Sequence, residues 1–162
     1  MPRTEGLPKN MACFLDLIAH SELGELIDYP NADDGYKIIV GSTLKSPILF
    51  DDYSDHPRHR IWLPKLNVFS TAAGRYQILA RYYDSYKVSL NLPDFSPESQ
   101  DKIAVQMIHE CHADADIAVT NIESAIYKCN SRWASFPGAG YKQHENQMEV
   151  LLAVYRTLMN GS

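Results

Sequence analysis

The sequence predicts an α+β fold that is mostly helical, with one small antiparallel sheet in the N-terminal third of the chain. Apolar residues recur at helical spacing in several separate segments. Two short runs rich in β-branched residues, 37–40 and 48–50, flank a Gly-Ser pair that can turn the chain. The chain has 162 residues, a length typical of one domain with its own core, so we expect residues 1–162 to form a single domain.

The chain begins with a polar segment that is followed by a helix. Residues 1–10 contain proline and few apolar side chains, so we expect them to be flexible. Residues 11–23 place Leu15 and Ile18 on one apolar face, which predicts an amphipathic helix. The polar run YPNADDG at 29–35 is typical of a loop before the first strand.

The middle of the chain combines turns, one more short strand and a long helix. Residues 51–57 (DDYSDHP) are turn-rich, and 58–69 mix basic and apolar residues around a short β-type run, 61–63. A helix is expected to begin at Ser70 or Thr71 and to end near residue 90, because Tyr76, Ala80, Tyr83 and Lys87 then share one side.

Three further helices are predicted in the C-terminal half. Ser96-Pro97-Glu98 combines a capping serine, a first-turn proline and an acid near the helix dipole, and apolar residues follow at helical spacing as far as Cys111. Residues 120–129 and 145–159 show the same spacing, with a break at 136–140 (FPGAG).

Composition excludes several classes of protein. The net charge is −5, so no general attraction to nucleic acid is expected. No apolar run suits a signal peptide or a transmembrane segment, and we expect no stable membrane insertion. The three cysteines are widely separated, which favours reduced thiols in a cytoplasmic product.

Glu22 is the main candidate for a catalytic residue. It lies seven residues after Leu15, on the apolar face of the first predicted helix. A carboxylate in that position either pairs with a cation or lines a cleft, where desolvation raises its pKa and makes it a proton donor near neutral pH. A structural role is the more common one for a single such Glu, so both interpretations stay open here.

Other groups of polar residues give weaker signals. Asp51, Asp52 and Asp55 follow a strand, where a second carboxylate of a glycosidase can lie, but Asp is also the ordinary residue of turns. The HECH run at 109–112 is not H-E-x-x-H and has no further ligand cluster, so we expect neither a metal nor another cofactor. No G-x-S-x-G motif indicates a nucleophilic serine.

Several blocks together resemble one known family. FLDLIAHSE, GYKIIVG, DDYSDHP, STAAGRYQILARYYDSY, LPDFSPESQDKIAVQMI and CNSRWASFPGAGYKQ occur in the order typical of lambda-type phage endolysins. The resemblance covers residues 12–145, and the STAAGRYQ and WASFPGAGY blocks are its most specific parts. It implies a lysozyme-like fold with a cleft between the sheet side and the helical lobe. It also implies lytic transglycosylase activity on bacterial peptidoglycan, leading to lysis of the host cell.

The same resemblance implies roles for individual residues. Glu22, in Ser21-Glu22-Leu23, matches the catalytic Glu of the family, although Leu23 stands where a Gly is usual. Residues 58–69 and 135–143 would form two lips over the saccharide cleft, with Lys142 in place of a frequent Gly. The residues implied in substrate binding are Tyr53, Tyr76, Gln77, Tyr141 and Gln143.

The implied reaction needs one acid, which protonates the glycosidic oxygen and then acts as base on the muramic acid 6-hydroxyl. The resemblance further implies a monomer that accumulates in the host cytoplasm and reaches the periplasm through a holin pore. Two other functions stay open: a hydrolysing muramidase that uses Glu22 with Asp52 or Asp55, and a non-catalytic peptidoglycan-binding module.

Overall fold

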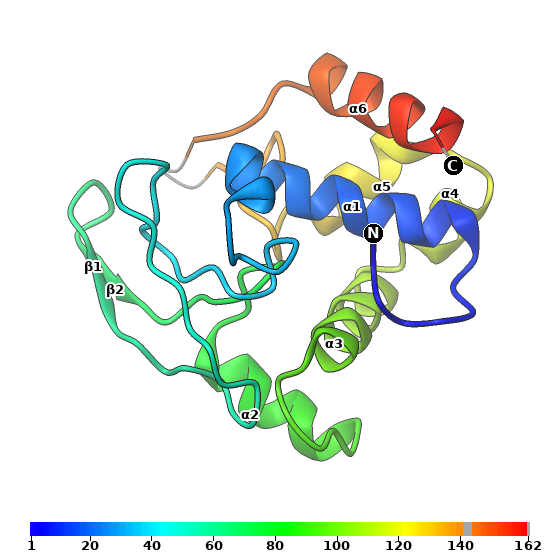
Figure 1. Ribbon diagram of the computed structural model, residues 1–162. Coiled ribbons are helices and arrows are strands. Elements are labelled where there is room, and N and C mark those ends of the chain that lie inside the picture. Colours follow the sequence, from blue (N-terminus) through cyan, green and yellow to red (C-terminus); the bar gives the residue numbers. More distant parts are fainter. Residues whose placement is uncertain (141–143, 162) are drawn as a thin grey trace.

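The computed structural model describes residues 1–140 and 144–161 and confirms the α+β class. Figure 1 shows most of the helices on one side and a β-hairpin projecting on the other. The helices are α1 (Lys9–Leu23), the short 3-10 helix η1 (Gly24–Asp28), α2 (Ala80–Ser89), α3 (Pro97–Glu110), α4 (Asp114–Ala118), α5 (Ile122–Cys129) and α6 (Met148–Asn160). The strands are β1 (Ile61–Leu63) and β2 (Val68–Ser70).

Helix α1 lies at the centre of the helical side, where α6, α4 and α3 pack against it (Figure 1). Phe14, Leu15, Leu17 and Ile18 have no exposed surface, so α1 is buried around most of its circumference. Burial of this kind is the main favourable contribution to folding. The helix ends at Leu23, and Gly24 follows with a φ of +54°, a conformation that glycine adopts without strain. Because α1 is fixed by the core on nearly every side, its last turn is a rigid platform.

The two-stranded sheet lies further along the chain than we expected. Strands β1 and β2 are antiparallel, with Trp62 opposite Phe69. The runs 37–40 and 48–50, which were predicted to form the sheet, make only isolated bridges such as Ile38 to Leu49. The prediction of strands there was wrong because the pairing does not continue along the run: Ile38 pairs with Leu49, but Ile39 pairs with Ala73 of a later turn.

Residues 71–79 form a tight turn instead of the first part of a helix. Ala73 pairs with Ile78 in an isolated bridge, and α2 begins only at residue 80. Gly74 has a φ of +82°, and a Cβ there would lie 2.1 Å from Oε1 of Gln100. Close approach of this turn to α3, together with positive φ at Gly74 and at Gln77 (+51°), excludes the helix that apolar spacing predicted.

The first residues of the chain make defined contacts with α3. The backbone amides of Arg3 and Thr4 donate hydrogen bonds of 2.7 and 2.8 Å to Oδ2 of Asp101. Lys9 and Asn10 already belong to α1. The N-terminal segment therefore connects α1 to α3.

The helices of the C-terminal half agree with the sequence pattern except at their ends. Ser96 caps α3 by accepting a hydrogen bond from the Ser99 amide at 3.4 Å, and α5 covers the predicted segment. Helix α4 was not predicted, and α6 begins at Met148 because Glu145 instead accepts a hydrogen bond from the Ala139 amide. None of the helices in the described ranges has the length and apolar character needed to cross a bilayer.

A cluster of buried polar side chains joins the helical side to the loops before and after the hairpin. Asp101 on α3 has no exposed surface and accepts hydrogen bonds from the hydroxyls of Tyr36 (2.7 Å) and Tyr76 (2.6 Å). Arg75 pairs with Asp16 of α1 at 2.6 Å, and both side chains are buried. A charge removed from water is stable only with such partners, so these contacts fix the relative positions of the connected segments.

We expect Asp101→Ala to lower the free energy of unfolding by about 3–5 kcal/mol. The change leaves two buried tyrosine hydroxyls and the amides of the N-terminal segment without their acceptor. Urea denaturation of the variant and the wild type measures this difference. Asp51→Ala is the control: its side chain is fully exposed, and the expected change is within about 0.5 kcal/mol. A loss below 1 kcal/mol in Asp101→Ala would contradict the structural role of this carboxylate.

Candidate functional site

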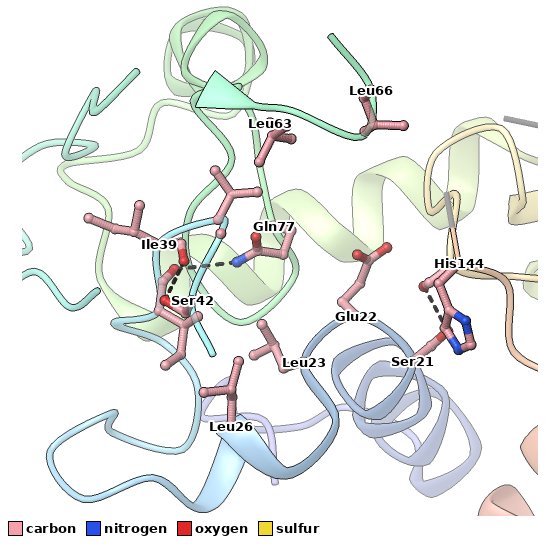
Figure 2. A pocket seen from close by; sticks show the side chains of 14 residues that line it. Ser21, Glu22, Leu23, Leu26, Ile39, Ser42, Leu63, Leu66, Gln77 and His144 are labelled. Carbon is pink, nitrogen blue, oxygen red and sulfur yellow. Dashed lines mark hydrogen bonds between the residues drawn. The ribbon is translucent and has the colours of Figure 1, made fainter. Parts of the chain in front are cut away.

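Two adjoining hollows meet at Glu22 and together form a groove between the hairpin side and the helical side. Their volumes are about 260 and 200 Å³, and the larger one is shown in Figure 2. Both are lined by Glu22, Val40, Leu63 and Gln77. The hairpin contributes Leu63 to both hollows, and the loop between its strands contributes Leu66 to the larger one. The other wall includes residues 131–135, so segments from the two predicted lips line the groove.

The carboxylate of Glu22 points into this groove from the last turn of α1 (Figure 2). In the figure it lies between Gln77 and Leu63 on one side and Ser21 and His144 on the other. Desolvation raises its pKa from the ordinary 4.5 to about 7, and a hydrogen bond with Ser135 offsets part of this rise. Glu22 is therefore protonated in a large fraction of molecules near neutral pH, as a general acid requires.

The end of α1 is held in place by a set of small polar side chains that sequence reasoning missed. The hydroxyls of Ser21 and Ser135 lie 2.7 Å apart, and the Asn146 amide group donates to the Ser21 hydroxyl at 3.0 Å. The Asn146 backbone amide donates to the Ser135 carbonyl at 2.8 Å. These contacts bring the residue next to Glu22 against the segment after α5. Only their position in the fold identifies them, because isolated serines and asparagines carry no signal of their own.

Tyr76 and Gln77, both predicted to bind substrate, do line the groove. The ring of Tyr76 is buried and forms part of the floor, while its hydroxyl is engaged with Asp101 and the Trp133 indole donates to its carbonyl at 3.1 Å. The Gln77 amide group donates to the Gly74 carbonyl at 2.9 Å. Tyr76 therefore shapes the groove, and Gln77 lines both hollows while its side-chain nitrogen is bound to the turn.

The structure does not bring Tyr53 to the groove. Its hydroxyl donates to Asp33 at 2.5 Å, and its ring contacts Phe50 edge-on at 5.7 Å between centroids. Tyr53 supports the loops behind the groove and is not among the residues that line it. Tyr141 and Gln143, the two other residues implied in binding, lie outside the described residues.

The aspartates of the DDYSDHP run also lie away from the groove. Asp52 accepts a hydrogen bond from the Ser54 amide at 2.8 Å, and Asp55 pairs with Arg58 at 2.9 Å. The same guanidinium pairs with Asp84 at 2.6 Å. These contacts lower the pKa of both Asp52 and Asp55, with the Ser54 hydrogen bonds as the largest cause for Asp52 and the Arg58 hydrogen bond for Asp55. Both carboxylates serve the local turn.

Glu22 is the single carboxylate among the described residues that line the two hollows. Glu25, the nearest acid along the chain, is exposed on η1 and does not line either hollow. The residues in the same set that can carry a positive charge are Arg132 and His144. The groove therefore offers one carboxyl group, with a raised pKa, and no second carboxyl group within the described lining.

The HECH run lies on the far end of α3 and the turn after it. His109 is exposed and lies 3.2 Å from Asp114, and His112 is exposed with a φ of +57°. Within residues 1–140 and 144–161, no three His, Cys, Asp or Glu side chains are placed to hold a metal ion. Cys111 forms a side-chain hydrogen bond with the buried Cys129, and burial raises the pKa of that thiol.

Comparison of the sequence with known proteins finds a matching family model and relatives that carry the same name. A family model described as Endolysin matches residues 12–161. The endolysin of Escherichia phage P2 is 44% identical over 153 residues, which cover 92% of this chain and 92% of that protein. The endolysin of Escherichia phage lambda is 46% identical over 144 residues, which cover 88% of this chain and 87% of that protein.

Solved structures give the same result for the fold. The lysozyme of bacteriophage lambda complexed with a chitohexasaccharide superposes with a TM-score of 0.86 and 40% identity, covering 96% of this chain and 97% of that one. A second structure of the bacteriophage lambda lysozyme gives 0.82 and 41% identity, with the same coverage. The lysozyme-like fold that the sequence resemblance implied is confirmed.

The raised pKa of Glu22 predicts how stability changes with pH. A folded-state pKa of about 7 against an ordinary 4.5 means that the contribution of Glu22 is fully present below about pH 4.5 and is lost as the pH rises through about 7. Glu22→Gln has no charge to desolvate, so we expect it to exceed the wild type in melting temperature at pH 8 but not at pH 4. Calorimetry at both values measures this, and a carboxyl NMR titration gives the pKa directly. Equal destabilisation of the variant at both pH values would instead indicate a structural pairing of the carboxylate.

Proposed function

We propose that this chain, which belongs to the endolysin family and has the lysozyme-like fold, is a lytic transglycosylase. As a member of that family it is an enzyme that acts on peptidoglycan. It cleaves the β-1,4 bond between N-acetylmuramic acid and N-acetylglucosamine and leaves a 1,6-anhydro sugar. The observation that carries this proposal is the single carboxylate of raised pKa in the groove.

The proposed reaction uses Glu22 twice. Its protonated carboxyl gives a proton to the glycosidic oxygen, so that the bond from that oxygen to C1 of muramic acid breaks with the electron pair on the leaving sugar. The resulting carboxylate takes the proton of the muramic acid 6-hydroxyl, whose oxygen bonds to C1. Glu22 ends protonated, ready for the next cycle. The nucleophile belongs to the substrate, so no water has to be positioned.

The groove supports this assignment over a two-carboxylate mechanism. Inverting hydrolysis requires a second acid to activate water, and retaining hydrolysis requires a second acid as nucleophile. Asp52 and Asp55 are committed to the Ser54 amide and to Arg58, outside the groove. A muramidase that uses Glu22 with either of them is the second candidate function, and the aspartate used would have to leave its present partner.

Saccharide binding is proposed for the groove as a whole. The related lambda lysozyme structure contains a chitohexasaccharide. We therefore expect the groove of this chain to accept a glycan strand. Gln77 lines both hollows, and the buried Tyr76 lines the smaller one. Tyr141 and Gln143 stay proposed contacts on the second lip. A non-catalytic binding module is disfavoured by the raised pKa of Glu22, which such a module would not need.

We also propose the cellular setting that follows from this activity. The enzyme would accumulate in the host cytoplasm, pass through a holin pore and act as a monomer in the periplasm. Fractionation of infected cells with and without holin function tests this setting. Activity in the periplasm without holin would contradict it.

The product distinguishes the proposed reaction from hydrolysis. We expect muropeptides released from purified Gram-negative peptidoglycan to be lighter by one water than hydrolysis products, since the 6-hydroxyl replaces water as nucleophile. Mass spectrometry without a reduction step measures this. Products with intact reducing ends would establish the muramidase alternative and direct attention to Asp52 and Asp55.

We expect Glu22→Gln to reduce turnover by at least about 10³-fold because the amide keeps the shape but cannot donate and recover a proton. Release of soluble muropeptides measures the rate. Asp52→Asn is the matched control and should keep nearly full activity, because this side chain serves a turn. Chelator should not change the rate. Retained wall lysis in Glu22→Gln would remove the basis of the assignment.

A further inference from the structure

Arg132 lines the smaller of the two hollows that form the groove. It lines the same hollow as Glu22 and Tyr82, and 28% of its side chain is exposed. Its backbone amide donates to the Cys129 carbonyl at 3.0 Å, so it sits in the turn that directly follows α5. The reaction proposed above gives this cation no role.

Contacts with Glu110 and Tyr82 hold the Arg132 side chain in this position. Its Nη2 donates to Oε2 of Glu110 at 3.1 Å, and its guanidinium lies 5.7 Å from the centre of the Tyr82 ring. The Tyr86 hydroxyl also donates to Glu110, and burial with this hydrogen bond raises the pKa of Tyr86 to about 12. Glu110 is therefore kept in place by a second donor, and Arg132 is steadied without depending on substrate.

Most of the hydrogen-bonding capacity of this guanidinium is still available. Arginine has five N–H donors in a planar fork. Within the described ranges, Glu110 supplies the one protein acceptor that contacts it. A fork of this kind binds carboxylates through two parallel hydrogen bonds, more strongly than neutral groups. The open side of Arg132 therefore fits a carboxylate that enters the groove.

We propose that Arg132 binds a carboxylate attached to the 3-O-lactyl substituent of muramic acid, which makes it a specificity-determining residue. This inference rests on the proposed saccharide substrate but not on the fate of the cleaved bond. A neutral chitin-type saccharide has no such group, whereas a peptidoglycan strand has one on each peptide-bearing muramic acid. The carboxylate belongs either to the stem peptide or, where the peptide has been removed, to the lactyl group itself.

The test measures dissociation constants in the Glu22→Gln background, in which strands are bound but not cleaved. Three ligands separate the possible sources of the carboxylate. The first is a soluble glycan strand with its peptides. The second is the same strand after amidase treatment, which removes the peptides and frees the lactyl carboxylate, and the third is a chitohexasaccharide. Titration calorimetry of Glu22→Gln and of Glu22→Gln with Arg132→Gln gives the Kd for each.

We expect Arg132→Gln to raise the Kd for the peptide-bearing strand about tenfold, because the variant loses one charge-assisted hydrogen bond at a partly exposed site. The Kd for the chitohexasaccharide should not change. A rise confined to the peptide-bearing strand assigns the contact to the peptide, and a rise confined to the amidase-treated strand assigns it to the lactyl carboxylate. A rise for both strands means that either carboxylate can occupy the same position. Added salt should weaken binding of the peptide-bearing strand and should do so less after Arg132→Gln.

Two further variants separate recognition from a structural role. Arg132→Lys keeps the charge without the fork and should recover part of the affinity. Arg81→Gln is the matched control, because Arg81 lies 4.9 Å from the centre of the same Tyr82 ring but does not line the groove. An equal loss of affinity for the chitohexasaccharide after Arg132→Gln, or no loss for either strand, would overturn the proposal. A hydrolytic product from the wild type would overturn the transglycosylase assignment. It would not affect the proposal for Arg132, which depends only on the measured Kd values.

Discussion

The architecture depends on a small number of charges that have been removed from water. Asp101 receives two tyrosine hydroxyls and two amides of the N-terminal segment, so it connects α3 to the start of the chain and to the loops before and after the hairpin. Arg75, paired with Asp16, connects the turn that carries Gln77 to α1, which carries Glu22. The two walls of the groove are thus positioned by contacts whose loss would leave a buried charge without a partner.

Desolvation and neighbouring charges shift the pKa values of Asp55 and Glu22 in opposite directions. Asp55 lies beside the Arg58 guanidinium, which keeps its pKa low, so that it is a permanent anion that organises a turn. Among the described residues, the Ser135 hydroxyl is the one group that lowers the pKa of Glu22, so desolvation dominates and favours the neutral acid. Arg132 lines the same groove and contacts Glu110 through one of its nitrogens, and it is not among the groups that shift the pKa of Glu22, so a cation and a protonated acid coexist there.

The sequence was sufficient where local physics decides the structure. Spacing and capping predicted α1, α3 and α5 to within a few residues, and the apolar stripe on α1 identified Glu22. The sequence was not sufficient where a contact between distant residues determines the local structure. Residues 71–79 form a turn because Gly74 lies against Gln100, and apolar periodicity does not reveal this contact. Ser135 and Arg132 became visible only in the fold, since their roles come from the residues that surround them.

The contacts around Ser21 also have a consequence for synthesis of the protein on the ribosome. Ser21 meets Ser135 and Asn146, which are 114 and 125 residues later in the chain. The segment that packs against the last turn of α1, which carries Glu22, is therefore absent from a nascent chain until α5 and the residues after it have left the exit tunnel. An incomplete translation product carries Glu22 but not the contacts that fix the end of α1, so the groove around this carboxylate is complete only after almost the whole chain has been made.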